Sequence, residues 1–218
     1  MACLPVVVGF VSPYGEDMTD LLTPPTPIAA ASLDVARRWL SPDLVNHSVR
    51  SWAWASLLAR DEGRAFDEEL LFVAAMLHDA GVASHFDAHE VAFEEAGGAV
   101  AAVFGAGAGW SPARSERVRE IIERHMWRSV DPALDVEGYL LELATTLDVR
   151  GDGASRWQEA DLRSITARVP RLDFGRAFDA SIAAQAARKP ETAAVRLHAS
   201  GGVAAGTAFW DAFAATGS

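Results

Sequence analysis

Leu77-His78-Asp79-Ala80-Gly81 closes an apolar run that begins near Leu70, and this stretch decides how the chain folds. The run is apolar on nearly every side, which is typical of a helix buried in a core. A histidine followed directly by an aspartate is an unusual end for such a helix, because a buried ionised carboxylate is costly unless it is paired or binds a metal. We expect Gly81 to end the helix as a left-handed residue. The stretch therefore predicts a metal ion at a buried helix end.

Three other predicted helices carry a polar side chain on their apolar face. His47 does so in a helix predicted over about residues 43–60. His125 continues the apolar stripe of a helix that opens with a Ser-Pro dipeptide. Asp148 lies on the apolar stripe of a helix predicted over about residues 136–149. We expect these side chains to point inward, toward the same core as the first stretch.

The composition bounds the class of protein. The chain has 218 residues, 50% of them hydrophobic, which is enough for one sizeable core. Its formal net charge is −11, and such a surface repels phosphate backbones and anionic lipids, so we expect no nucleic-acid partner and no membrane partner. Cys3 alone excludes an internal disulfide framework and fits a reducing compartment. These features predict a cytoplasmic protein with a small-molecule substrate, and the apolar segment Phe209–Phe213 leaves a homo-oligomer open.

The periodicity predicts an all-α fold with one helical bundle and a central metal site. The prolines of residues 1–27 predict an extended N-terminal arm. Residues 28–155 are expected to form the metal-binding core, and residues 156–218 further helices packed on it. Strict alternation of apolar residues is confined to the short stretch at 6–8, so we expect no sheet. The glycine-rich stretch 105–109 is expected to be a loop.

The inward donors are two kinds of group, imidazoles and carboxylates. They are His47, His78, Asp79, His125 and Asp148. Such a set suits zinc, iron or manganese and leaves a position for water. A closed structural zinc site would use cysteines, which the chain lacks. Zinc is the first candidate cofactor, and iron and manganese are the alternatives. In an open site, the metal lowers the pKa of the water that it binds toward neutrality.

Four sequence blocks, in this order, resemble the HD-domain superfamily of metal-dependent hydrolases, and within it the cyanamide hydratase-like branch. The blocks are Asn46-His47-Ser48-Val49-Arg50, Leu77-His78-Asp79-Ala80-Gly81, Phe93-Glu94-Glu95-Ala96-Gly97-Gly98-Ala99 and Leu147-Asp148-Val149-Arg150-Gly151. The resemblance implies that the metal ligands are His47, His78, Asp79 and Asp148. It also implies that Asp79 and His125 serve catalysis, with His125 either a further ligand or a proton donor to the substrate.

Four further residues are candidates for supporting roles. Arg50 follows His47 by one turn and either pairs with a nearby carboxylate or binds an anionic substrate. Glu94 either orients a ligand or a water molecule, or is an ordinary surface carboxylate. His85 and His89 have the spacing to hold a second metal if their stretch is helical, and otherwise belong to a solvated loop.

The resemblance and the residues together leave three functions open. The first is a metal-dependent hydrolase or hydratase that adds activated water to a small polar substrate of the cyanamide or nitrile type. The second is a phosphohydrolase of nucleotides or other phosphoesters, for which Arg50, Arg124 and Arg128 are the basic candidates. The third is a non-catalytic helical scaffold whose metal only stabilises the fold.

Overall fold

The computed structural model describes residues 21–216, and within them the chain forms helices and no strand. The helices are α2 (Pro27–Trp39), α3 (Pro42–Asp61), α4 (Glu68–Leu77), η1 (Ala80–Val82), α5 (Phe93–Gly107), α6 (Pro112–Arg124), α7 (Val136–Arg150), η2 (Ala154–Arg156), α8 (Glu159–Arg168), α9 (Phe174–Arg188), α10 (Ala193–Ser200) and α11 (Gly202–Ala215). The all-α prediction is confirmed. Most of the predicted N-terminal arm lies outside the described residues, and Pro27, its last residue, is the first residue of α2.

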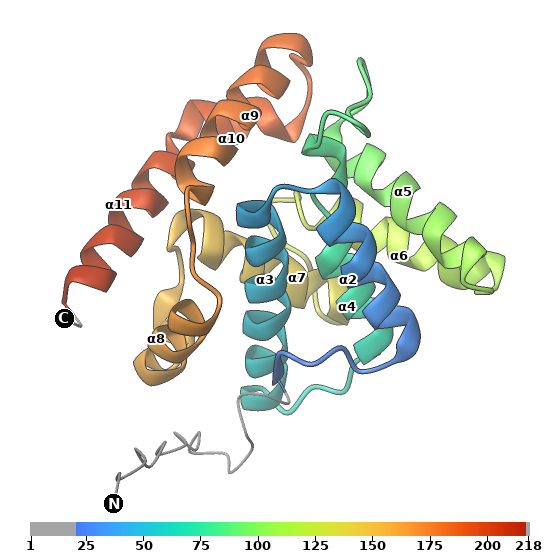
Figure 1. Cartoon of the computed structure of the whole chain (residues 1–218), viewed down its shortest axis with the longest axis horizontal. Helices are drawn as coiled ribbons and strands as arrows, with labels where there is room; N and C mark the ends of the chain where they lie inside the picture. The colour runs from blue at the N-terminus through green and yellow to red at the C-terminus, as the bar shows by residue number, and fades with distance from the viewer. Residues whose placement is uncertain (1–20, 217–218) are drawn as a thin grey trace, which may run out of the picture.

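Helix α3 runs through the middle of the molecule (Figure 1). Helices α2, α4, α5 and α6 lie on one side of it, and α8 to α11 lie on the other. Helix α3 packs on α4 and α7, and α11 packs on α7 and α9. Helix α7 therefore connects the central helices with the C-terminal ones.

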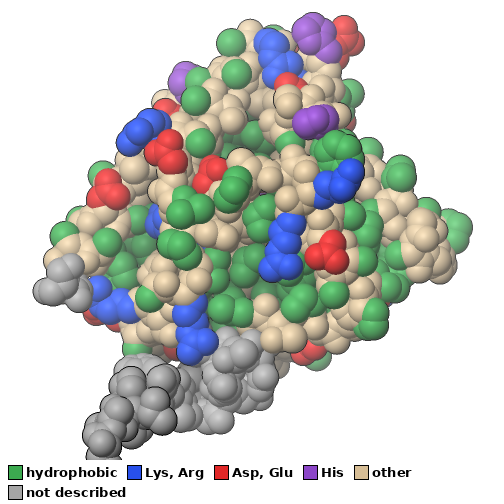
Figure 2. Space-filling view, in the orientation of Figure 1, with side chains coloured by type: hydrophobic (Ala, Val, Ile, Leu, Met, Phe, Trp, Pro, Cys, Tyr) green, Lys and Arg blue, Asp and Glu red, His purple; other side chains and the backbone are tan. Residues whose placement is uncertain are grey.

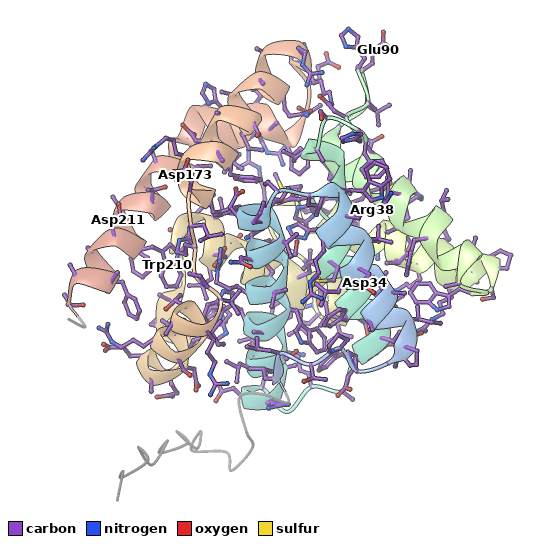
Figure 3. The ribbon with its side chains drawn as sticks, viewed as in Figure 1. Asp34, Arg38, Glu90, Asp173, Trp210 and Asp211 are labelled. Atoms are coloured by element: carbon purple, nitrogen blue, oxygen red, sulfur yellow. The ribbon has the colours of Figure 1, made fainter. Side chains whose placement is uncertain are left out.

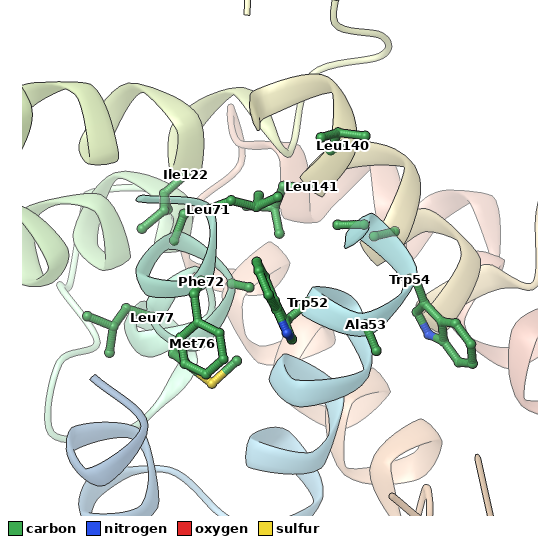
Figure 4. Packing of buried hydrophobic residues seen from close by; sticks show 14 of the residues in the cluster. Trp52, Ala53, Trp54, Leu71, Phe72, Met76, Leu77, Ile122, Leu140 and Leu141 are labelled. Atoms are coloured by element: carbon green, nitrogen blue, oxygen red, sulfur yellow. The ribbon is translucent and has the colours of Figure 1, made fainter. Parts of the chain in front are cut away.

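The core lies between α3, α4, α6 and α7 (Figure 4). Trp52 of α3 meets Phe72 of α4 with ring centroids 5.1 Å apart. Ile122 of α6 and Leu141 of α7 are fully buried in the same cluster. Helix α4 is buried along its whole length from Leu70, which confirms the prediction of a helix that is apolar nearly all round.

Helix α4 ends at Leu77, and Gly81 does not end it in the predicted way. Gly81 is not among the described glycines with a left-handed backbone, and it lies inside η1. A Cβ atom at this position would lie 2.1 Å from the carbonyl oxygen of Phe93. The residue is glycine because α5 begins in direct contact with η1, so the prediction of a left-handed helix stop was wrong.

The stretch 105–109, which we expected to be a loop, is partly helical, because α5 continues through Gly107. The glycines of α5 allow neighbouring segments to approach it closely. A Cβ atom on Gly97 would lie 2.5 Å from the carbonyl oxygen of His78, and one on Gly98 would lie 2.9 Å from the Arg119 side chain. The turn that carries His78 is thus held tightly against α5.

Acidic and basic side chains are interspersed over the face shown in Figure 2. Within residues 21–216, no helix combines the length and apolarity needed to cross a bilayer.

Candidate metal centre

The structure brings His47, His78 and Asp79 together in the interior. His47 comes from the first half of α3, and the other two residues follow α4 directly. The Nε2 atoms of the two histidines are 3.0 Å apart. Asp79 Oδ2 lies 3.4 Å from Nε2 of His47 and 3.3 Å from Nε2 of His78. All three side chains are buried. Their three possible ligand atoms lie within 4.8 Å of one another, which is close enough for one ion to bind all three.

The hydrogen bonds on the far sides of the two rings decide which nitrogens carry protons. Nδ1 of His47 lies 2.7 Å from Asp148 Oδ2, and Nδ1 of His78 lies 2.8 Å from the carbonyl oxygen of Ala75. Both partners accept hydrogen bonds only, so each Nδ1 carries a proton, and the neutral form of each ring has its lone pair on Nε2. In the neutral forms, two lone pairs and a carboxylate oxygen converge, and a cation between the three atoms relieves their repulsion.

The electrostatics of the cluster also favour a cation. Burial alone would lower the pKa of His78, but the carboxylate of Asp79 raises it, so the site attracts positive charge. Burial opposes ionisation of Asp79, yet the nearby imidazoles of His78 and His47 lower its pKa to about 2. Asp79 Oδ2 has no hydrogen-bond partner among the described residues. The donor set, two imidazoles and one carboxylate, fits a divalent metal with open coordination positions.

His125 lies beside this cluster, at the end of α6. Its ring is perpendicular to that of His78 at a centroid distance of 5.0 Å, and its Nε2 is 4.0 Å from Asp79 Oδ1. Nδ1 faces the carbonyl oxygen of Ile122, so Nε2 is again the bare nitrogen. Burial lowers the pKa of His125 to about 3, which leaves the imidazole neutral at physiological pH.

Asp148 points inward as predicted, but the structure does not bring it into the three-residue cluster. Its carboxylate lies at the Nδ1 side of His47, away from the Nε2 atoms. Arg50, which is fully buried, binds both carboxylate oxygens at 2.8 Å. Of the two roles considered for Arg50, the structure therefore supports pairing with a carboxylate near the site. That Asp148 also ligates the metal stays a prediction from the resemblance.

The other candidates lie outside the cluster. Glu94 is buried in the first turn of α5, its Oε2 has no hydrogen-bond partner among the described residues, and burial raises its pKa. His85 and His89 are exposed in the segment between η1 and α5, and the ring of His85 contacts Trp39. This segment is not an α-helix. The helical spacing that would pair the two histidines around a second metal is therefore absent.

A cavity of about 470 Å³ opens beside the cluster, between the central helices and the C-terminal ones. His47, His78, Asp79 and His125 line one wall of it. Several further lining residues were not singled out in the sequence: Met126, Glu142, Thr145, Thr146, Phe178, Arg196 and Leu197. Some of them share the face of α7 that carries Glu142, and others come from α9 and α10, where the sequence shows no motif. The one sequence signal for these lining residues is the spacing of inward-facing positions on α7.

Comparison with known proteins agrees with this geometry. A family model described as "HD domain" matches residues 44–150. Two proteins of Saccharomyces cerevisiae (strain ATCC 204508 / S288c), cyanamide hydratase DDI2 and cyanamide hydratase DDI3, are each 29% identical to this chain over 162 residues, which is 72% of this chain and 72% of each relative. The predicted resemblance to the HD superfamily and its cyanamide hydratase-like branch is confirmed. The family match ends at Arg150, so α8 to α11 lie beyond it.

Proposed function

Because this chain belongs to the HD-domain superfamily, we propose that it is a metal-dependent hydratase that adds water to small polar substrates of the cyanamide or nitrile class. The coarser part of this description, a metal-dependent hydrolase or hydratase, follows from the HD domain and from the similarity to the two yeast cyanamide hydratases. The substrate class and zinc as the resident ion are the proposal. The observation that carries it is the convergence of His47, His78 and Asp79 at the wall of a cavity.

The metal would be held by Nε2 of His47, Nε2 of His78 and Oδ2 of Asp79. The other nitrogen of each ring, Nδ1, makes the hydrogen bond on its far side, and Asp79 Oδ2 has no hydrogen-bond partner among the described residues. A divalent metal in such a site lowers the pKa of water that it binds toward neutrality, and so supplies a nucleophile that bulk water does not. His125 presents Nε2 to the same cavity, and we propose that it shuttles a proton there. The resemblance gives His125 two roles, a further metal ligand or a proton donor, and this proposal follows the second.

The arginines near the site favour the hydratase over the phosphohydrolase. Phosphoryl transfer needs cationic side chains free to bind the phosphate oxygens. Arg50 is committed to Asp148, and Arg124 binds Asp135 at 2.8 Å. Of the three basic candidates, Arg128 alone lines the cavity. Two further arginines on its wall have partners of their own: Arg150 binds Asp152 at 2.9 Å, and Arg196 donates to the carbonyl oxygen of Met126 at 2.8 Å. A neutral substrate with an electrophilic carbon does not need free cationic side chains on the cavity wall.

The test is hydration by the full-length, zinc-loaded protein. Urea formed from cyanamide is measured, and a series of substituted cyanamides and nitriles of increasing size is tried beside it. The series is informative because a cavity of about 470 Å³ has room for substrates much larger than cyanamide. We expect turnover of at least one member, and its loss after chelation.

The control variant is His78→Ala, which removes one proposed ligand. Turnover abolished in a variant that remains folded excludes the non-catalytic scaffold. Cleavage of nucleotides or phosphoesters by the wild-type protein, without hydration of any member of the series, would overturn the proposal in favour of the phosphohydrolase.

A further inference from the structure

We propose that the substrate carries a cationic amino group on an apolar tail, and that Glu142 binds this group while the carbon to be hydrated lies at the metal site. This inference rests on the proposed function and narrows its substrate class to amino-substituted nitriles and cyanamides. Glu142 lies near the middle of α7 and lines the same cavity as His47, His78 and Asp79. The proposed hydration gives this residue no role.

Glu142 is a buried acid with little to compensate its charge. Many acidic side chains of the chain are exposed, as Asp34, Glu90 and Asp173 are (Figure 3). Glu142 is only 8% exposed. Its carboxylate accepts one long hydrogen bond, at 3.3 Å, from the hydroxyl of Thr146. Burying a carboxylate is costly unless a cation or several hydrogen bonds compensate it.

Other buried acids show how the fold meets this requirement. Asp135 binds Arg117, and Asp148 binds Arg50. Of the three buried acids below, Glu142 alone lines the cavity beside the metal cluster, so a molecule in the cavity can supply the cation that the fold does not. Among the described residues, the buried acids that make no ion pair are Glu94, Glu142 and Asp161.

The electrostatics around Glu142 favour an added cation. Burial raises the pKa of its carboxyl, and the charges of Arg156 and Arg150 offset this effect only in part. These two arginines form ion pairs with other acids, Glu62 and Asp152. An ammonium group within hydrogen-bond distance would stabilise the ionised carboxylate of Glu142.

The rest of the cavity wall suits an apolar tail between the amino group and the reacting carbon. Glu142 precedes Asp148 by six residues, and an α-helix rises 1.5 Å per residue, so the two lie about 9 Å apart along α7. Asp148 is next to His47, at the metal end of the cavity. A short methylene chain covers such a distance. Apolar side chains that line the cavity and would contact the chain are Met126, Val149, Phe178 and Leu197.

The arginines of the same wall offer no equally buried site for a tail of the opposite charge. Arg128, Arg150 and Arg196 line the cavity, and all three are exposed. An ion pair with an exposed arginine contributes little, because water screens it. The buried carboxylate therefore favours an ammonium tail over a carboxylate tail.

The first test measures kcat/KM of the full-length, zinc-loaded protein for three compounds of similar length: δ-aminovaleronitrile, hexanenitrile and γ-cyanobutyrate. At the end away from the nitrile they carry an ammonium, a methyl and a carboxylate group, in that order. A hydrogen bond between charged groups corresponds to a factor of about 10 to 100. We expect δ-aminovaleronitrile to exceed hexanenitrile by this factor and γ-cyanobutyrate to be the poorest substrate.

The same comparison in Glu142→Gln should abolish the preference, because glutamine keeps the size of the side chain and removes its charge. The matched control is Asp152→Asn. Asp152 also lines the cavity, but Arg150 already binds its carboxylate, so this variant should keep the wild-type preference. The inference is overturned if the wild type prefers hexanenitrile or γ-cyanobutyrate, or if Glu142→Gln keeps the preference for δ-aminovaleronitrile.

A binding measurement separates this inference from the proposed function. If none of the three compounds is hydrated, the proposed function fails, and the compounds are titrated against the zinc-loaded protein by isothermal calorimetry. Tighter binding of δ-aminovaleronitrile than of hexanenitrile, lost in Glu142→Gln and kept in Asp152→Asn, would still identify Glu142 as the residue that binds the amino group. Equal binding of the two compounds would overturn the inference.

Nuclear magnetic resonance of the wild type covers the case in which Glu142→Gln does not fold. The backbone amide signals of Glu142 and Thr146 should shift on addition of δ-aminovaleronitrile and shift less with hexanenitrile. Equal shifts with both compounds would contradict a contact between the amino group and Glu142.

Discussion

His125 is the residue whose chemistry depends most on its hydrogen bond. Because Nδ1 faces the carbonyl oxygen of Ile122, Nε2 is free at the cavity wall, 4.0 Å from the nearest Asp79 oxygen. We predict that His125→Ala lowers turnover about 100-fold or more, the range for loss of general acid–base catalysis. Zinc content should stay at the wild-type value. A variant that loses its zinc together with its activity would instead make His125 a further metal ligand.

The buried carboxyl of Glu94 should make the free energy of unfolding depend on pH. Burial raises the pKa of its carboxyl above the ordinary value of 4.5, so the folded chain keeps the proton to a higher pH than the unfolded chain. Stability is complete below the unfolded-state pKa and falls as the pH rises through the folded-state pKa. Glu94→Gln, which stays neutral, should therefore be more stable than the wild type at about pH 7 and equal to it near pH 4.

Urea unfolding of chelator-treated protein measures this difference without interference from metal release. Glu95→Gln is the control, because Glu95 is the exposed neighbour in the same first turn of α5. It reports the effect of a lost charge at the helix N-terminus alone. A stability difference between Glu94→Gln and the wild type that is the same at both pH values would contradict the prediction.

At the scale of elements, α5 sets the position of the His-Asp turn. A Cβ atom on Gly97 would lie 2.5 Å from the carbonyl oxygen of His78. Gly97→Ala should therefore push α5 away from this turn, cost about 1–3 kcal/mol of unfolding free energy and weaken zinc binding. Gly107→Ala is the matched control in the same helix, because nothing lies within 4 Å of a Cβ atom there. The control should be neutral or slightly stabilising, since alanine favours helix over glycine. Equal effects of the two substitutions on zinc affinity would disprove the proposed contact.

The predictable elements were those with a strong apolar period and a proline or polar residue at the start. Helices α3 and α6 begin at Pro42 and Pro112, as their Ser-Pro dipeptides indicate. The sequence predicts where α4 ends, but not why residue 81 is glycine. The reason is the carbonyl oxygen of Phe93 in α5, which leaves no room for a Cβ atom at residue 81. Helix α5 ran past its expected end through alanines and glycines whose sequence alone resembles a loop.

For the site, the sequence was informative where a helical face carries the signal. His47, His78 and His125 were predicted to point inward, and all three line the cavity. The partner of Asp148 could not be predicted, because the inward face of a helix does not determine which edge of an imidazole a carboxylate meets.

At the scale of the whole molecule, the metal should stabilise the fold because its ligands come from separate helices. Binding to the folded chain alone adds RT ln(1 + [L]/Kd), about 2.7 kcal/mol when free zinc is at 100 times Kd. We therefore expect chelation to lower the Tm of the full-length protein and added zinc to restore it. Scanning calorimetry measures this change. The Tm of His78→Ala should not respond to either treatment, and a response equal to that of the wild type would place the stabilising ion elsewhere.

The most direct test of the metal centre is elemental analysis of the full-length chain purified without chelator, beside His78→Ala and the control His89→Ala. His89 is exposed in the segment before α5 and lies outside the cluster. We predict about one divalent metal ion per chain in the wild type and in His89→Ala, and none in a folded His78→Ala, as expected when a ligand of an open site is removed. A wild-type chain that binds no metal even after reconstitution, or a His78→Ala variant with the wild-type metal content, would contradict the account.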